Sequence, residues 1–152
     1  MRHLKLLFIA FLCSAFLTLA HANAVLTDIH GQKIPFVNLK GKWVLINYWA
    51  SWCRPCLDEI QELNRFYQAR KDDVVLYAVN FDSLPIEDQV ELIKTLDIRY
   101  PSLSKDPGNQ LGLGNVRGVP ATFVFDPNGN LSTTLYGGQT LSSLNEAIHS
   151  TT

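Results

Sequence analysis

The chain has 152 residues, of which 47% are hydrophobic and 18% are charged, and its formal net charge is −1. This length suits one domain, and the composition is that of a globular protein with a buried core. The near-balanced charge and the absence of a polybasic run argue against a nucleic-acid partner.

The N-terminal segment differs from the rest of the chain. It begins with the basic residues Arg2 and Lys5, continues with an almost wholly apolar run over residues 6–19, and ends in the small-x-small sites Ala20-His21-Ala22 and Ala22-Asn23-Ala24. This layout is typical of a secretory signal peptide. The apolar run is shorter than the ~20 residues that a membrane span needs, which favours a cleaved signal peptide. An uncleaved N-terminal anchor is the alternative interpretation.

We therefore expect residues 1–24 to be a signal peptide and residues 25–152 to form one domain, periplasmic or secreted after cleavage. Cleavage would remove Cys13 and leave Cys53 and Cys56. A disulfide between them would close too small a loop to stabilise the fold much. The pair therefore favours catalysis over a structural crosslink.

The first half of the expected domain reads as a hairpin, a strand and a helix. Residues 25–36 alternate weakly around a turn at His30-Gly31 and predict a short edge hairpin. Residues 43–49 are nearly continuously apolar, which is typical of a central strand buried on both faces. A helix is expected over residues 54–70, because Cys56, Ile60, Leu63 and Tyr67 follow helical spacing.

The second half continues the alternation. We expect a buried strand over 74–81 and then a helix over 85–96, whose apolar stripe is Ile86, Val90 and Ile93. An irregular segment over 100–114, with one helical turn near Gln110, should lead to a hairpin of strands 121–125 and 131–136. A closing helix is marked by Leu141, Leu144 and Ile148. The order β-α-β-α-β-β-α predicts an α/β fold whose first strands are parallel and whose last two are antiparallel.

The motif Trp52-Cys53-Arg54-Pro55-Cys56 stands between the expected central strand and its helix. A helix N-terminus offers unpaired backbone N–H groups and partial positive charge, which favour a thiolate. A thiolate is the species that attacks a disulfide. The pattern predicts a redox dithiol, with Cys53 as the partly exposed nucleophile and Cys56 as the more buried resolving thiol.

Two other ligand sites were weighed. A structural zinc site needs about four ligands, and His30 and His149 are far from the cysteines in sequence. Gly112-Leu113-Gly114 follows no predicted strand, and its third glycine is misplaced at Gly118, so it does not form a nucleotide loop. We expect neither a metal nor an organic cofactor.

The motifs resemble those of a known family. Asn47-Tyr48-Trp49-Ala50-Ser51-Trp52-Cys53-Arg54-Pro55-Cys56 resembles the active-site segment of thioredoxin-like proteins, and Gly118-Val119-Pro120-Ala121-Thr122-Phe123 resembles their cis-proline loop. The lead-in segments 28–31 and 39–47 are similar to the TlpA/ResA/DsbE branch. The resemblance covers residues 25–149. It implies a thioredoxin-like fold, with a central mixed sheet flanked by helices and a short N-terminal hairpin.

The resemblance also assigns supporting residues. It implies that Trp52 covers the cysteines, that Arg54 and Pro55 tune the reduction potential, and that a cis bond between Val119 and Pro120 sets a backbone edge beside the sulfurs. Arg54 could lower the Cys53 pKa or be a solvated side chain with little effect.

The candidate acid/base is less clear from the sequence. Ordinary thioredoxins carry a buried acid where this chain has Asn47. Some members of the branch carry a glutamate after the second strand. In this chain an ungapped match places Ser83 at that position, and the neighbouring Asp82 is the candidate acid/base.

The branch comprises periplasmic or membrane-tethered thiol–disulfide oxidoreductases, several of which serve cytochrome c maturation. The resemblance therefore implies an enzyme that reduces disulfides in exported proteins and is recharged by a membrane thiol donor. Three alternatives remain: an oxidant that donates disulfides, a binding module or chaperone on the same scaffold, and a peroxidase of related fold. The intact cysteine pair argues against the last two.

Overall fold

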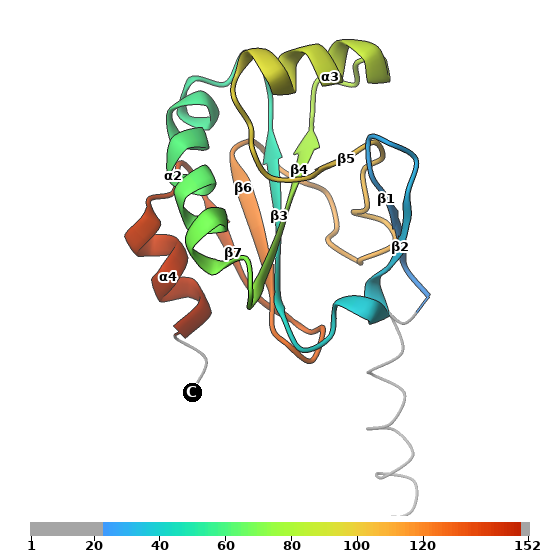
Figure 1. Cartoon of the computed structure of the whole chain (residues 1–152), viewed down its shortest axis with the longest axis vertical. Helices are drawn as coiled ribbons and strands as arrows, with labels where there is room; N and C mark the ends of the chain where they lie inside the picture. The colour runs from blue at the N-terminus through green and yellow to red at the C-terminus, as the bar shows by residue number, and fades with distance from the viewer. Residues whose placement is uncertain (1–22, 150–152) are drawn as a thin grey trace, which may run out of the picture.

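The centre of the molecule is a five-stranded mixed sheet in the order β5-β4-β3-β6-β7 (Figure 1). The strands are β3 (Trp43–Trp49), β4 (Val74–Asn80), β5 (Ser102–Leu103), β6 (Ala121–Phe125) and β7 (Leu131–Tyr136). This computed structural model describes residues 23–149, so the expected signal peptide lies almost wholly outside the described residues. Strand β3 pairs parallel with β4 and antiparallel with β6.

Strand β3 is buried on both faces, as its apolar sequence predicts. Leu45 and Trp49 pack in the core cluster that contains the helices α2 and α4. Val44, Ile46 and Tyr48 pack in a second cluster on the opposite face. The alternation follows from the period of two along a strand. Asn47 therefore faces the same side as Leu45 and Trp49.

Helices α2 (Arg54–Arg70) and α4 (Leu141–His149) lie side by side on one face of the sheet (Figure 1). Helix α2 has the predicted bounds, and α4 contains the three residues that marked the expected closing helix. Helix α3 (Ile86–Thr95) forms where it is expected, with Pro85 as the residue that precedes it. The predicted stripe of α3 is only half-buried, and Gln89 is its buried residue. Its side-chain N–H donates to the backbone carbonyl of Leu84.

The other face of the sheet is covered by the N-terminal hairpin. Strands β1 (Val25–Thr27) and β2 (Lys33–Pro35) pair antiparallel and lead into the short 3-10 helix η1 (Phe36–Leu39). The carboxylate of Asp28 accepts hydrogen bonds from the backbone N–H groups of His30 and Gln32, which closes the turn. The predicted hairpin is confirmed.

The segment 100–114, expected to be irregular, contains the edge strand β5. Ser102 and Leu103 pair parallel with Ala78 and Val79 of β4. A two-residue strand is too short to give a periodic signal. Among the described residues, no helix is long and apolar enough to cross a membrane.

Candidate active site

The two cysteines of the motif form a disulfide at the first turn of α2. The Cys53 and Cys56 sulfurs are 2.13 Å apart. Cys53 is the extended residue that precedes the helix, and its Sγ accepts a hydrogen bond from the Cys56 backbone N–H at 3.3 Å. That N–H belongs to the unpaired set at a helix start, and it favours negative charge on the sulfur.

Cys53 is buried more deeply than expected, whereas Cys56 is buried as expected. Cys53 is 4% exposed and Cys56 is fully buried, so the expectation of a partly exposed Cys53 is wrong for this structure. The reason is packing, because both residues belong to the core cluster that contains Trp49 and Ile60. Cys53 is still the more exposed of the two cysteines, as expected.

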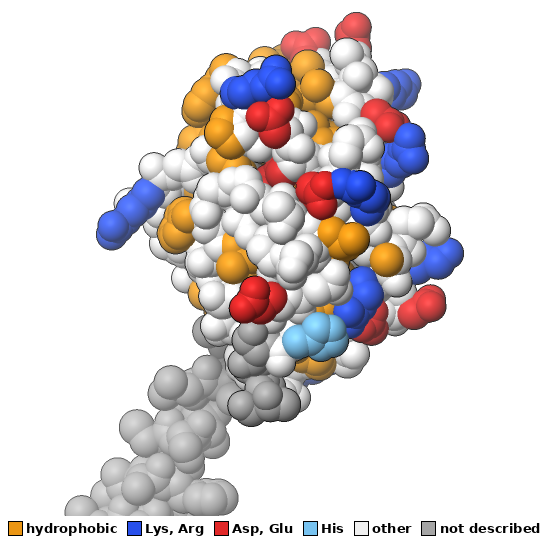
Figure 2. Space-filling view, turned by 90° about the vertical axis from the view of Figure 1, so that its left-hand side faces the viewer, with side chains coloured by type: hydrophobic (Ala, Val, Ile, Leu, Met, Phe, Trp, Pro, Cys, Tyr) orange, Lys and Arg blue, Asp and Glu red, His pale blue; other side chains and the backbone are white. Residues whose placement is uncertain are grey.

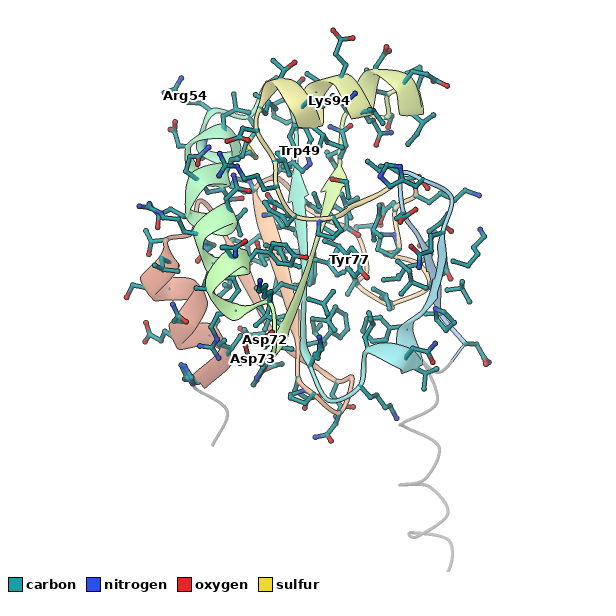
Figure 3. All side chains as sticks on the ribbon, viewed as in Figure 1. Trp49, Arg54, Asp72, Asp73, Tyr77 and Lys94 are labelled. Carbon is teal, nitrogen blue, oxygen red and sulfur yellow. A yellow bond between two sulfur atoms is a disulfide. The ribbon has the colours of Figure 1, made fainter. Side chains whose placement is uncertain are left out.

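The residues beside the cysteines take different positions. The Trp52 side chain is exposed to 70%. Hydrophobic side chains gather at the upper end of the molecule in the space-filling view (Figure 2). Helix α2 begins at this end, where Arg54 is labelled in Figure 3. The Arg54 guanidinium points into solvent and pairs with Asp58 at 3.0 Å, one turn along the helix. Pro55 occupies the first turn of α2, where its missing N–H costs no hydrogen bond.

The second predicted loop lies beside the first. The Val119–Pro120 peptide bond is cis, as the resemblance implies. It directly precedes Ala121, which pairs with Tyr48 near the end of β3. Val119 packs against the core cluster that contains both cysteines. Segments that are distant in sequence thus meet at the carboxyl end of β3.

Asp82 is engaged in the loop before the cysteines. Its Oδ2 accepts hydrogen bonds from the Ser51 backbone N–H and from the Asn80 side chain, both at 2.8 Å. These bonds tie the end of β4 to the segment that precedes Cys53. They give the carboxylate a structural task, whatever its part in proton transfer.

The structure places a buried acid that the sequence analysis missed. Glu59 is 3% exposed and lies three residues after Cys56 on the same side of α2. Its Oε1 accepts from Nδ2 of Asn47 at 2.8 Å, and its Oε2 accepts from the backbone N–H of Gln139 at 2.8 Å. Two signals pointed to it: an acid beside the apolar stripe of α2, and an amide at position 47.

Burial determines the charge of Glu59. Desolvation raises its pKa to about 7 from an ordinary value of 4.5, although the hydrogen bonds from Asn47 and Gln139 act in the opposite direction. A carboxyl group that titrates near neutral pH can accept or release a proton under working conditions. This acid occupies the buried side of the helix that carries the cysteines.

The segment before α4 and the first residue of α4 are fixed along the first turns of α2. Besides the bond from Gln139 to Glu59, the Leu141 backbone N–H donates to Glu62 at 2.8 Å. Gly138 lies so close to Pro55 that a Cβ there would be 3.4 Å from the Pro55 carbonyl oxygen. The helix that carries the cysteines is thus supported by the C-terminal part of the chain.

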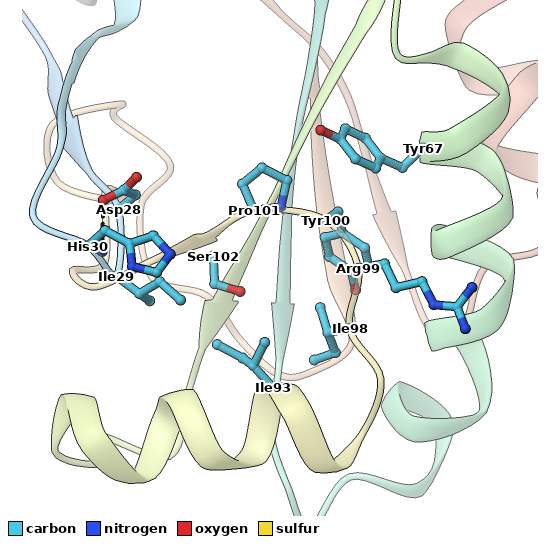
Figure 4. A pocket seen from close by; sticks show the side chains of 10 residues that line it. All are labelled: Asp28, Ile29, His30, Tyr67, Ile93, Ile98, Arg99, Tyr100, Pro101 and Ser102. Atoms are coloured by element: carbon cyan, nitrogen blue, oxygen red, sulfur yellow. Dashed lines mark hydrogen bonds between the residues drawn. The ribbon is translucent and has the colours of Figure 1, made fainter.

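A separate cavity of about 390 Å³ lies at the β5 edge, and none of the motif residues lines it. Figure 4 shows Ile93, Ile98 and Pro101 around it, with His30 on one side and Tyr67 on the other. Its charged side chains are engaged elsewhere: Arg99 pairs with Asp97, and Asp28 closes the hairpin turn. Within residues 23–149, no group of three His, Cys, Asp or Glu residues could hold a metal ion.

The comparisons with known proteins agree with this geometry. Residues 20–134 match the AhpC/TSA family. The thiol-disulfide oxidoreductase ResA of Bacillus cereus is 33% identical over 124 residues, which are 80% of this chain and 70% of that protein. The thiol:disulfide interchange protein HelX of Rhodobacter capsulatus is 37% identical over 120 residues, which are 76% of this chain and 66% of HelX.

The fold has solved counterparts. The crystal structure of StoA from Bacillus subtilis superposes with a TM-score of 0.66 at 28% identity, covering 81% of this chain and 93% of StoA. The thioredoxin-like fold expected from the sequence is confirmed. The chain therefore belongs to the AhpC/TSA family of thioredoxin-like proteins and, within it, to the ResA-like thiol–disulfide oxidoreductases of the TlpA/ResA/DsbE branch.

Proposed function

We propose that the chain is an exported thiol–disulfide oxidoreductase that reduces disulfides in other exported proteins through Cys53 and Cys56. The observation that carries the proposal is the Cys53–Cys56 disulfide at the start of α2, with the Cys53 sulfur in contact with a helix N–H. In the reduced enzyme, the same N–H would stabilise a Cys53 thiolate.

The reaction balances as two thiol–disulfide exchanges. The Cys53 thiolate attacks one sulfur of the substrate disulfide, forms a mixed disulfide and releases the other sulfur as a thiolate. Cys56 then loses its proton and attacks Cys53, which releases the second substrate thiol and forms the Cys53–Cys56 disulfide. Two electrons and two protons pass to the substrate. A second dithiol, which we propose to be a membrane protein, must reduce the enzyme again.

The supporting residues receive roles in this scheme. Trp52 is exposed beside the disulfide and offers an apolar contact for a polypeptide. The Val119 backbone, ahead of the cis bond to Pro120, offers hydrogen-bonding groups to an extended substrate chain. Glu59 is placed to receive the proton of Cys56, which lies one helical turn away on the same buried side.

The cellular setting is also part of the proposal. The basic and apolar segment 1–24 supports export through a cleaved signal peptide, with an uncleaved anchor as the alternative. The resemblance to the TlpA/ResA/DsbE branch supports a place in cytochrome c maturation. N-terminal sequencing of the exported protein tests the first point, because a start at Asn23 or Val25 indicates cleavage after Ala22 or Ala24 and a start at Met1 indicates an anchor.

A trapping experiment tests the assignment of the sulfurs. Cys56→Ser should accumulate mixed disulfides with substrate proteins, because the resolving thiol is gone, and Cys53→Ser should accumulate none. Equal trapping by both variants would show that the order of attack is wrong. An insulin-reduction assay beside a holdase assay separates an enzyme from a chaperone, since a chaperone would suppress aggregation without consuming thiols.

A further inference from the structure

The Asn47 side chain joins groups from three other parts of the fold. It is fully buried on β3. Its Nδ2 donates to Glu59 on α2 at 2.8 Å and to the Thr122 hydroxyl on β6 at 3.0 Å. Its Oδ1 accepts from the Tyr100 hydroxyl, just before β5, at 3.5 Å. Both ends of the amide are therefore engaged.

The direction of these bonds decides which end of the amide faces Glu59. An ionised carboxylate can only accept hydrogen bonds, so it binds the N–H end of the Asn47 amide and is repelled by the oxygen end. The Thr122 hydroxyl can donate or accept and fits either end. Tyr100, which donates to Oδ1, holds the oxygen end away from Glu59.

The Tyr100 hydroxyl is a permanent donor in this site. The residue is 3% exposed, and burial, followed by the nearby charge of Glu59, raises the pKa of its phenol far above the ordinary value. It therefore keeps its proton at any working pH. A bond accepted by an amide oxygen also strengthens the bond that the amide N–H donates, because chains of hydrogen bonds polarise one another.

We propose that Tyr100 is a positioning residue for the buried acid: its hydroxyl orients the Asn47 amide, and that amide in turn stabilises the ionised Glu59 carboxylate one helical turn from Cys56. The consequence for the thiols rests on the proposed function. The orientation of the amide does not depend on it.

Few other titratable groups surround Glu59. On α2, the cysteines precede it, and Glu62 follows it, engaged with Arg65 and the Leu141 N–H. The segment before α4 contributes the Gln139 backbone N–H, and β6 contributes Thr122. His149, at the far end of α4, contacts Arg70 instead. Tyr100 is the titratable side chain joined to Glu59 through Asn47.

The test is a pH titration of the Glu59 side-chain carboxyl carbon by NMR in the oxidised protein, where the cysteines do not titrate. The signal is assigned with Glu59→Gln. Tyr100→Phe keeps the ring and removes the donor, which should weaken the stabilisation of the ionised Glu59. Glu59 should then bind its proton at least about threefold more tightly, which is the size expected from one lost hydrogen bond. Tyr67→Phe, a change at another tyrosine packed on the same core, is the matched control and should leave the midpoint unchanged.

A double-mutant cycle tests whether the effect passes through the amide. In an Asn47→Leu background, which keeps the approximate volume, Tyr100→Phe should no longer shift the Glu59 midpoint. An unchanged midpoint in the single Tyr100→Phe variant would overturn the proposal. An equal shift with and without Asn47 would also overturn it, because Tyr100 would then act directly.

The reduced protein supplies the link to chemistry. In wild type and Tyr100→Phe, the pH dependence of Cys56 alkylation should shift together with the Glu59 midpoint. The titration in the oxidised protein needs no turnover, so a protein that fails to reduce insulin would refute the proposed function while still showing whether Tyr100 orients the network.

Discussion

The buried carboxyl group of Glu59 makes part of the stability of this protein depend on pH. The pKa of Glu59 is about 7 in the folded chain and ordinary, near 4.5, in the unfolded chain. Between these values the folded state binds more protons than the unfolded state, so stability falls as the pH rises from about 4.5 to 7. A pKa difference of this size corresponds to about 3 kcal/mol.

Glu59→Gln should remove most of this pH dependence. A neutral amide resembles the protonated acid, so the variant should be close to wild type in stability at pH 5 and more stable at pH 8, by up to about 3 kcal/mol. Denaturant unfolding of the oxidised proteins at the two pH values measures the difference. Glu87→Gln, a change at an exposed acid of α3, is the control. If wild type and Glu59→Gln lost equal stability between pH 5 and 8, Glu59 would have an ordinary pKa.

Substitutions of the two acids near the motif, Glu59 and Asp82, should affect the rate of mixed-disulfide resolution differently. Glu59→Gln should slow the resolution of a mixed disulfide most strongly near neutral pH, where the carboxylate would accept the Cys56 proton. Asp82→Asn should change the rate without changing the shape of the pH profile, because Asp82 holds the Ser51 and Asn80 side of the loop. Stopped-flow release of a chromogenic thiol measures both. The opposite pattern would assign the acid/base role to Asp82.

At the scale of elements, the arginines at the two ends of α2 make different contacts. Near its C-terminus, the Arg70 guanidinium donates to Asp73 and, at 3.0 Å, to the Asn145 side chain on α4. Near its N-terminus, Arg54 pairs with Asp58 in solvent, with 83% and 59% of the side chains exposed. The first arginine joins two helices, and the second joins neighbouring turns of one helix.

We therefore expect Arg70→Ala to lower the free energy of unfolding by about 1–2 kcal/mol, because it breaks several charged hydrogen bonds. Arg54→Ala, the matched change on the same helix, should cost less than about 0.5 kcal/mol. Chemical unfolding measures both, and hydrogen exchange should show faster opening of α4 in Arg70→Ala alone. Equal costs would mean that the contact with Asn145 contributes nothing.

Periodicity made the elements predictable where a run was long enough to carry it. Strand β3 and helix α2 begin and end at the expected residues because continuous burial and a helical stripe each leave a clear pattern. The two-residue β5 carries no period. The predicted stripe of α3 marks its half-buried side, where Ile93 packs against the core. It gave no sign that Gln89 is the buried residue, because Gln89 is held by a hydrogen bond to the Leu84 carbonyl.

Across the whole molecule, the site depends on residues that the chain order separates widely. The sequence predicted the cysteines and the Val119–Pro120 loop, because each has a local motif. It did not predict the group formed by Asn47, Glu59 and Tyr100, because their meeting depends on the register of β3 with its neighbours and on the way α2 crosses the sheet. The local signs of this group are a polar residue in an apolar strand, Asn47, and an acid beside the apolar stripe of α2, Glu59.

The direction of electron flow is a property of the whole fold, because the potential reports which redox state the fold stabilises. The helix start and Arg54 favour a Cys53 thiolate and raise the potential. The exposed Arg54 contributes only about 0.5 kcal/mol, which is about 10 mV for a two-electron couple. The buried Glu59 carboxylate acts in the opposite sense, because negative charge behind the cysteines disfavours thiolates.

We therefore expect a reductant, with a Cys53–Cys56 potential below about −200 mV at pH 7, in the range of thioredoxin and glutaredoxins. Equilibration with glutathione or dithiothreitol buffers, followed by alkylation and mass spectrometry, measures it. Glu59→Gln should raise the potential above that of wild type at pH 8 and leave it nearly unchanged at pH 5, where both side chains are neutral. A wild-type potential above about −150 mV, towards that of a strong disulfide donor, would reverse the proposed direction and make this protein an oxidant of exported thiols.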